Sequence, residues 1–414
     1  MKSAACAALV GLLALPASVW AGRRDPVAPE IPVSATRLSS RVLVLECLDV
    51  NVTAVATSRG IVLVDTGRSP RLMEAMARRI EKELGRRGVR YIINTHLDPD
   101  HCAGNQVFPE ATVVAHENGP EFLRHNRADS PSGLWFFRER LGQARVRLSG
   151  PGLGPAEADS LRGVICARET LLEDMQGRYV PRSPTLTVRD RLCLELGDVR
   201  FELIACGRAH TNNDLLVYVP QERLLMTGDL FCGPDHLCFA VNPLVDAVGL
   251  CARFDSLLAE PSGLETVVPG HGRPFSRSDL NRLLLLLRER PAGSVRRKSA
   301  AATLDTLISV LGVDAARARM APGAVAAADS FYGSEEEFQQ LARTYRWMGR
   351  LTEAVSILKC GLTWFPKSPL LLQGLGSAHY ESGDTAAAID CYQRSLALMP
   401  ENRAAMEMLK LLRR

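Results

Sequence analysis

The segment from Thr95 to His101 reads Thr-His-Leu-Asp-Pro-Asp-His. Its side chains at 96, 98, 100 and 101 are two imidazoles and two carboxylates, which is too dense a set of metal ligands for an ordinary loop. Three later segments carry side chains of the same kinds, namely Gly-Arg-Ala-His210-Thr, Met-Thr-Gly-Asp229-Leu and Pro-Gly-His271-Gly. Imidazoles and carboxylates suit zinc, iron and manganese. The pattern predicts a site for two divalent cations with seven ligands, which are His96, Asp98, Asp100, His101, His210, Asp229 and His271.

Apolar, Val-rich segments around these ligands predict an α/β fold. The ligand segment begins where a short buried strand ends, and loops at strand ends are where rigid scaffolds present chemistry. Strands are predicted over 42–47, 52–57, 61–65, 91–94, 191–196, 199–204, 215–219, 223–226 and 266–268. Helices are predicted over 70–85, 248–259 and 278–290. Strands that alternate with helices in two halves predict an αββα sandwich over 36–290.

Two other regions are predicted to be mainly helical. Residues 119–183 form an insertion of helices beside the site, interrupted by the Gly- and Pro-rich stretch 150–155. A Pro, Gly and basic stretch at 291–298 marks a boundary, and we expect a helical linker over 291–333.

The C-terminal part, 334–414, contains an internal repeat. Leu341, Gly349, Ala354 and Pro366 recur as Leu375, Gly383, Ala388 and Pro400, each 34 residues later. Small residues stand where paired helices touch, and this period is similar to that of tetratricopeptide repeats. We expect two repeats, with a capping helix at 402–413 and the helices of the linker at the other end. These helices either bind a partner, mediate self-association or only pack on the preceding domain.

The N-terminus and the composition bear on location and partners. Residues 1–21 combine Lys2, an apolar stretch and a small-residue cleavage site, so we expect a signal peptide, a periplasmic or secreted protein and no membrane span after cleavage. A membrane anchor is the alternative. Basic and acidic residues number 50 and 46, and no basic stripe indicates nucleic-acid binding. Of the 11 cysteines, Cys232 and Cys238 are the favoured disulfide pair.

The order and spacing of the motifs resemble the metallo-β-lactamase-fold hydrolase superfamily. The resemblance covers about 36–290, through Val64-Asp65-Thr-Gly67, 95–101, His210-Thr211, Gly228-Asp229 and Gly270-His271-Gly272. It implies the αββα fold, a dinuclear metal centre with zinc as the family's usual ion, and hydrolysis of a small-molecule substrate. The acid at Asp229 resembles the glyoxalase II-like branch.

The resemblance also implies a role for each ligand. Position 98 would bind the first metal with two histidines, and Asp229 would bridge both ions. The remaining assignments are His96 and His210 to the first metal and Asp100, His101 and His271 to the second. Asp100 would also orient the attacking hydroxide. Asp65 would support the ligand loop, and His236 would lie behind the ligands or near the substrate.

Asp98 departs from the family pattern, in which this position is usually His. A carboxylate can bind metal there, as the Glu of the flavodiiron branch does. Together with Asp100, Asp229 and one hydroxide it would cancel the charge of two divalent cations. A face of two imidazoles and one carboxylate favours iron or manganese more than an all-imidazole face does.

Three functions are consistent with these residues. The first is an exported metal-dependent hydrolase acting on an ester, thioester, lactone, phosphoester or sulfur-containing bond. The second is a diiron redox protein, suggested by Asp98. The third is a binding protein that acts through its repeats.

Overall fold

A computed structural model gives the fold of the chain. It describes residues 31–85, 88–125, 128–129, 131–234, 246–259, 263–288, 298–320, 331–332 and 334–412. The predicted signal peptide at 1–21, together with His236 and Cys238, lies outside the described residues. None of the helices within the described ranges combines the length and the apolar character that a membrane span requires.

The first sheet has seven strands in sequence order. They are β1 (Ser34–Arg37), β2 (Val42–Cys47), β3 (Val50–Thr57), β4 (Gly60–Val64), β5 (Val89–Ile93), β6 (Thr112–His116) and β7 (Leu186–Val188). Strands β1 to β4 pair antiparallel, whereas β4 to β7 run parallel to one another. The carboxyl ends of β4 and β5 therefore lie side by side at one edge, where Asp65 and the ligand segment follow them.

The second sheet has six strands in the order β13-β12-β11-β10-β9-β8. They are β8 (Arg191–Glu195), β9 (Arg200–Ala205), β10 (Leu215–Val219), β11 (Leu224–Gly228), β12 (Thr266–Pro269) and β13 (Phe275–Ser276), with the short 3-10 helix η2 (Pro220–Glu222) after β10. Strand β10 is antiparallel to both β9 and β11, and β11 is parallel to β12. Consequently β9, β11 and β12 all end at the same edge.

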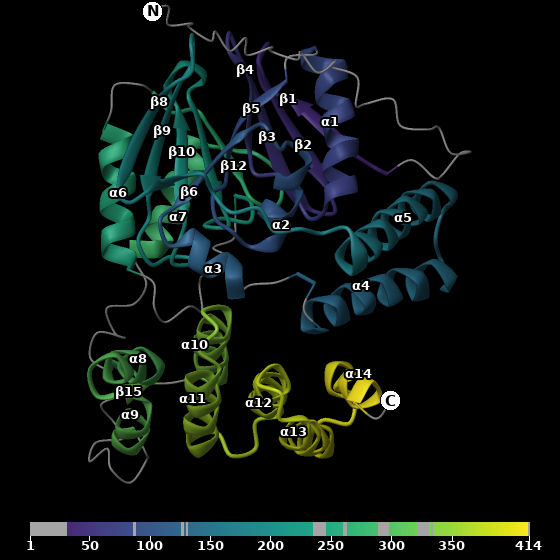
Figure 1. Cartoon of the computed structure of the whole chain (residues 1–414), viewed down its shortest axis with the longest axis vertical. Coiled ribbons are helices and arrows are strands. Elements are labelled where there is room, and N and C mark those ends of the chain that lie inside the picture. The colour runs from purple at the N-terminus through teal and green to yellow at the C-terminus, as the bar shows by residue number, and fades with distance from the viewer. Residues whose placement is uncertain are drawn as a thin grey trace, which may run out of the picture. The chain divides into compact units, whose positions relative to one another are not determined.

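The two sheets pack face to face. Their inner faces meet in a buried cluster that includes Val44, Val62, Phe201 and Val217. Helix α1 (Pro70–Leu84) covers the outer face of the first sheet, and α6 (Ala247–Ala259) and α7 (Arg277–Arg288) cover that of the second (Figure 1). The predicted αββα sandwich is therefore confirmed. Continuous Val- and Leu-rich strands form its centre because both faces of each sheet are covered.

The sequence also explains where α1 begins and ends. The hydroxyl of Ser69 accepts a hydrogen bond from the backbone N–H of Leu72, and Pro70 stands at the first helical position. Gly85 ends the helix with a φ of +81°, which a residue with a Cβ rarely adopts.

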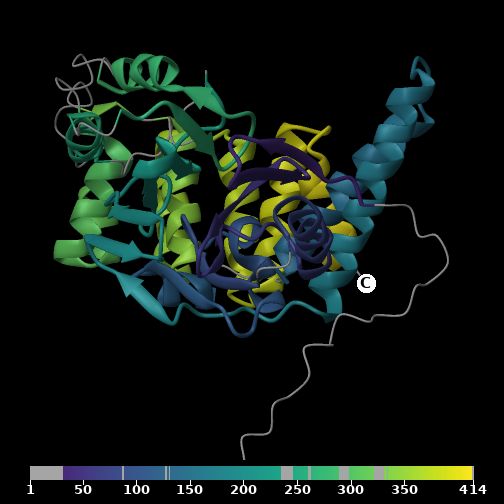
Figure 2. The ribbon, with the colours of Figure 1, turned by 90° about the horizontal axis from the view of Figure 1, so that it is seen from above.

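The insertion consists of α3 (Gly119–His125), α4 (Pro131–Ser149) and α5 (Pro155–Gly177), as predicted. Helices α4 and α5 form a pair whose outer end extends beyond the two sheets (Figure 2). The pair is anchored at Asp174, a fully buried residue of α5 whose carboxylate accepts hydrogen bonds from the backbone N–H and Nε of Arg71.

The described residues of the predicted helical linker over 291–333 are only partly helical. They include α8 (Ala300–Leu311) and α9 (Val313–Arg319), but also the strands β14 (Lys298–Ser299) and β15 (Phe331–Tyr332), which pair parallel. Strands of two residues have no periodicity to detect, so the sequence pattern missed them.

The repeats are two helical hairpins followed by one helix. They comprise α10 (Glu335–Trp347), α11 (Leu351–Trp364), α12 (Pro369–Glu381), α13 (Thr385–Leu398) and α14 (Arg403–Leu412). Gly349 and Gly383 occupy the same turn of each hairpin with φ values of +70° and +85°. Helices α8 and α9 pack on the first hairpin, and α14 packs on the second. The 34-residue period therefore corresponds to one hairpin, with helices at both ends.

Candidate metal centre

The ligand segment 95–101 is held at the edge between the two sheets. It follows β5 and enters α2 (Pro99–Cys102), which the 3-10 helix η1 (Ala103–Val107) continues. The backbone carbonyl of Thr95 accepts a hydrogen bond of 2.7 Å from the N–H of Leu215, and the Leu97 N–H donates to Asn213 at 2.9 Å. A segment that follows the first sheet is thus fixed to residues of the second.

The other ligands follow strands of the second sheet. His210 comes after β9, Asp229 directly after β11 and His271 shortly after β12. Gly228 and Gly270 allow the loops that carry Asp229 and His271 to lie close together. A Cβ on Gly270 would lie 2.0 Å from Oδ1 of Asp229, and Gly228 has a φ of +51°. These glycines of the Gly-Asp and Gly-His motifs are therefore required by the close packing of the loops.

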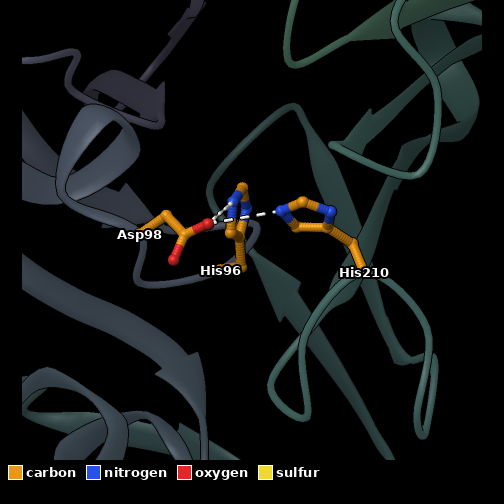
Figure 3. Close-up of side chains that lie close together, drawn as sticks. All are labelled: His96, Asp98 and His210. Atoms are coloured by element: carbon orange, nitrogen blue, oxygen red, sulfur yellow. Dashed lines mark hydrogen bonds and ion pairs between the residues drawn. The ribbon is translucent and has the colours of Figure 1, made fainter. Parts of the chain in front are cut away.

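The seven predicted ligands meet in one place. Three groups have ligand atoms within 4.8 Å of one another: His96, Asp98 and His210; His96, His101 and Asp229; and Asp100, His101 and His271. Figure 3 shows the carboxylate of Asp98 pointing at the imidazoles of His96 and His210. Its Oδ2 atom lies 3.5 Å from Nε2 of His96 and 3.3 Å from Nε2 of His210. The first and third groups are the two ligand sets that the resemblance implied.

Asp229 lies between the two sets. Its Oδ2 atom is 3.7 Å from Nε2 of His210 and 3.2 Å from Nε2 of His271. Its Oδ1 atom is 3.2 Å from Nε2 of His101. A carboxylate within reach of imidazoles from both sets has the position that a bridging ligand needs.

Hydrogen bonds on the far side of the rings orient the histidines. Nδ1 of His101 lies 3.0 Å from Asp65, and Nδ1 of His96 lies 3.1 Å from the hydroxyl of Thr95. Nδ1 of His271 hydrogen-bonds the backbone carbonyl of Asp49. A proton held on Nδ1 leaves the lone pair of Nε2 directed into the cluster, as metal-binding histidines require.

Asp65 is buried and contacts both Thr95 and His101. It is 2% exposed and has a φ of +62°. Besides contacting His101, its two carboxylate oxygens accept hydrogen bonds from the N–H and the hydroxyl of Thr95, at 2.8 Å and 2.7 Å. One buried carboxylate therefore positions both ends of the ligand segment, which fits the supporting role expected for it.

Two buried atoms of the cluster indicate that a cation fits there. Among the residues that the structure describes, Nε2 of His96 and Oδ1 of Asp229 are inaccessible to solvent and have no hydrogen-bond partner. A buried polar atom without a partner costs about 1–3 kcal/mol. Both are of the atom types that coordinate divalent metals, so a bound ion would satisfy them.

The carboxylates of the cluster are ionised at neutral pH. Burial opposes the charge of Asp98, but a hydrogen bond with His210 and the nearby imidazole of His96 hold its pKa below the usual value. Burial also opposes the charge of Asp229, and the charges of His101 and His271 hold its pKa well below the usual value. Burial opposes the charge of His101, His210 and His271, but the same carboxylates raise the pKa of each ring, that of His210 to about 9. A divalent cation would therefore bind in competition with protons on these rings.

Other residues near the centre were not predicted from the sequence. Nη1 of Arg68 lies 3.3 Å from Oδ2 of Asp100, and its Nε donates to the carbonyl of Leu48. Burial opposes ionisation of Asp100, and Arg68 keeps the pKa of this carboxyl below its usual value. Thr95 and Asn213 also support the ligand segment. Cys102 is buried, and burial raises the pKa of its thiol, which agrees with a packing role.

Two sequence profiles of known families match the chain. The sequence profile described as "Metallo-beta-lactamase superfamily" matches residues 45–289. The chain belongs to the metallo-β-lactamase superfamily. A tetratricopeptide-repeat profile matches residues 336–401.

Two relatives of the chain within this superfamily are distant in sequence. The chain is 22% identical over 241 residues to a linear primary-alkylsulfatase from Pseudomonas sp., a match that covers 57% of this chain and only 44% of the relative. It is 22% identical over 247 residues to a metallo-beta-lactamase type 2 from Bacillus cereus, covering 59% of this chain and 75% of the relative. Both relatives are named as hydrolases, and the chain spans less than half the length of the first one.

Solved structures of the superfamily are also similar to the chain. A metallo-beta-lactamase from Pontibacter korlensis is 19% identical with a TM-score of 0.42, covering 63% of this chain and 100% of that one. The DIM-1 metallo-beta-lactamase is 16% identical with a TM-score of 0.42, covering 62% and 97%.

Proposed function

We propose that the chain is a hydrolase that binds two divalent cations and cleaves an ester, thioester, lactone, phosphoester or sulfate ester bond. The observation that carries this proposal is the convergence of three ligand groups, of which the middle one shares His96 with the first and His101 with the third. His96, Asp98 and His210 would hold one ion, Asp100, His101 and His271 the other, and Asp229 would contact both. When bound, such ions supply Lewis acidity and lower the pKa of water.

Asp100 is the residue that we assign to the attacking water. Its side chain is 24% exposed, compared with 13% for Asp98 and 9% for Asp229, so it is the most solvent-exposed of these three carboxylates. Arg68 keeps it ionised, and an ionised carboxylate accepts a hydrogen bond from water. Asp100 therefore orients the water toward the carbonyl, phosphoryl or sulfuryl centre.

Metal analysis combined with activity tests this assignment. Protein purified without added metal is assayed for bound metals and for hydrolysis of a panel with one substrate for each bond type. We expect His101→Ala and Asp229→Ala to lose metal and at least about 100-fold of the activity, because each removes a ligand. His379→Ala is the matched control, since this histidine lies in α12 and pairs with Asp384. Full activity in metal-free protein would refute the proposal.

A diiron redox protein is the second candidate, favoured by the face that Asp98 forms with His96 and His210 (Figure 3). Two imidazoles and one carboxylate form the face typical of non-haem iron oxygenases. Iron-loaded protein that consumes oxygen with a chemical reductant, and hydrolyses none of the panel, would favour this candidate over the hydrolase.

We further propose that residues 1–21 direct export and are removed. Their composition is the support for this proposal. N-terminal sequencing of protein from the producing cell should begin at Gly22, and an intact N-terminus on membrane-bound protein would indicate an anchor instead.

A further inference from the structure

A cavity of about 850 Å³ lies over the ligand cluster, and the tetratricopeptide repeats form part of its wall. On one side are Asp98, Asp100 and His271. On the other are side chains of the repeats, among them Arg343 of α10 and Tyr392 of α13. The volume is within the range of small-molecule sites, about 300–1,000 Å³.

We propose that the repeats are part of the active site, and that Arg343 binds the anionic group of a substrate with a hydrocarbon tail. This inference rests on the proposed hydrolase function and specifies its substrate class. It also gives the repeats a role in substrate binding in addition to any contact with other proteins.

The position of Arg343 relative to the ligands supports this role. Arg343 lines the same cavity as Asp98 and Asp100. Burial lowers the pKa of Arg343, while the charges of these two carboxylates act in the opposite direction. Solvent still reaches the side chain through the cavity. Because arginine keeps its charge at any physiological pH, Arg343 is a permanent cation on the wall of the cavity that Asp98 and Asp100 also line.

Two other arginines of the cavity have different partners. Arg346, one turn along α10, forms a two-contact ion pair with Glu381 of α12. Arg68 pairs with Asp100 and with the carbonyl of Leu48. Arg343 is the other arginine that the repeats contribute to this wall within the described residues, and the charges of Asp98 and Asp100 favour its ionised form.

The charge of the ligand set explains why an arginine would be needed. Asp98, Asp100 and Asp229 would neutralise three of the four charges of two divalent cations, and a hydroxide would neutralise the fourth. A centre with an imidazole at position 98 would keep one net positive charge for an anionic substrate. Arg343 restores this charge from outside the ligand set, and a guanidinium binds planar or tetrahedral oxyanions with two hydrogen bonds.

Apolar side chains on the cavity wall indicate a hydrocarbon tail. Phe136 and Phe137 of α4 line it together with Leu351 and Met408 of the repeats. Phe136 is 41% exposed, which is unusual for a large aromatic side chain. An alkyl tail that covers these side chains would add apolar contact next to the charged group that Arg343 binds.

An equilibrium binding experiment on the full chain tests the proposal. The probes are 1-octanesulfonate, which has an anionic group but no ester bond, and 1-octanol, which lacks the charge. Isothermal titration calorimetry is carried out on metal-loaded wild type, Arg343→Gln and Arg343→Lys. Arg394→Gln is the control, because Arg394 lies on α13, is 56% exposed and pairs with Asp390.

We expect Arg343→Gln to weaken octanesulfonate binding about 10-fold or more and to leave octanol binding unchanged, since charged hydrogen bonds are the stronger ones. Arg343→Lys should retain part of the affinity, and Arg394→Gln all of it. An equal loss for both probes, no loss for the sulfonate, or no sulfonate binding to the wild type would overturn the proposal.

A chain-length series tests the apolar wall separately. Affinity should rise from hexane- to octane- to decanesulfonate, and Phe136→Ala should reduce this rise, because each buried methylene adds to binding. A series without a rise would refute the tail site. These assays involve no turnover. A protein that binds octanesulfonate through Arg343 but hydrolyses no substrate would refute the hydrolase function and leave the anion site in place.

Discussion

The Nδ1 atom of His101 lies 3.0 Å from Oδ2 of Asp65, and both side chains are buried. The same carboxylate accepts two hydrogen bonds from Thr95. The orientation of the His101 ring and the start of the ligand segment therefore depend on one residue that is not itself a member of the three ligand groups.

Asp65→Asn should weaken metal binding about 10- to 100-fold, the usual cost of losing a residue that orients a ligand. The amide cannot accept all three hydrogen bonds, so His101 would lose its fixed orientation. Titration with a competing chelator measures the change. Asp198→Asn is the control, because Asp198 is an exposed carboxylate that pairs with Arg41. Unchanged affinity in Asp65→Asn would show that Asp65 does not orient the ligand.

The native metal should reflect the carboxylate at position 98. We expect protein purified without added metal to contain iron or manganese at appreciable occupancy, because Asp98 gives the first ligand set a harder donor than imidazole. Asp98→His should shift the bound metal toward zinc. Elemental analysis of the two proteins, produced in the same medium, decides the question. Zinc alone in the wild type would contradict the expectation.

Gly270→Ala should displace the carboxylate between the two ligand sets. The added Cβ would lie 2.0 Å from Oδ1 of Asp229 and 2.9 Å from the backbone carbon of Gly228, so the loops must separate. A displacement of about 1 Å at a reacting centre can cost about 100-fold in rate, and we expect kcat/KM to fall by this order. Gly177→Ala, whose Cβ would meet nothing within 4 Å, is the matched control.

Circular dichroism distinguishes a local displacement of the loops from unfolding of the Gly270→Ala variant. Gly270→Ala should retain the secondary structure of the wild type while losing metal. A variant that retains both metal and activity would show that the loops tolerate the added methyl group.

Asp305 connects the metal-binding domain to the first repeat. Its Oδ2 atom lies 3.1 Å from Nη1 of Arg208, and its Oδ1 accepts a hydrogen bond of 2.7 Å from the hydroxyl of Tyr345. Burial and the hydrogen bond to Asp305 raise the pKa of Tyr345, so the phenol remains a donor well above neutral pH.

Asp305→Ala should therefore lower the free energy of unfolding by about 1–3 kcal/mol, because the buried hydroxyl of Tyr345 would lose its partner. Tyr345→Phe should lower the free energy of unfolding by less than Asp305→Ala does. The loss in the double variant should be smaller than the sum of the two single losses. Urea unfolding curves give these values. Strict additivity would show that the two side chains do not interact.

Much of the sandwich could be predicted because its strands are strongly apolar. The Val-rich segments at 42–47 and 215–219 coincide with β2 and β10. Strand β1 was missed because most of its residues are exposed and few of its side chains are apolar. Strands β14 and β15 are defined only by their pairing, which depends on the tertiary fold.

The ligands were predictable because four of them occur within one heptapeptide. The second sheet supplies the others, of which Asp229 and His271 directly follow a glycine. Arg343 could not be predicted in this way. It belongs to a repeat helix without a ligand motif, and a periodic pattern does not say which face of a hairpin lines a neighbouring cavity.

The division of the ligands between two sheets has a consequence for how the protein acquires its metal. Four ligands follow β5 of one sheet, and three follow β9, β11 and β12 of the other. Neither half alone offers a complete ligand set, so high-affinity binding requires docked sheets and a chain synthesised past His271. We therefore expect the metal to bind late in folding and to stabilise the contact between the two sheets. Removal of the metal by a chelator should then weaken this contact.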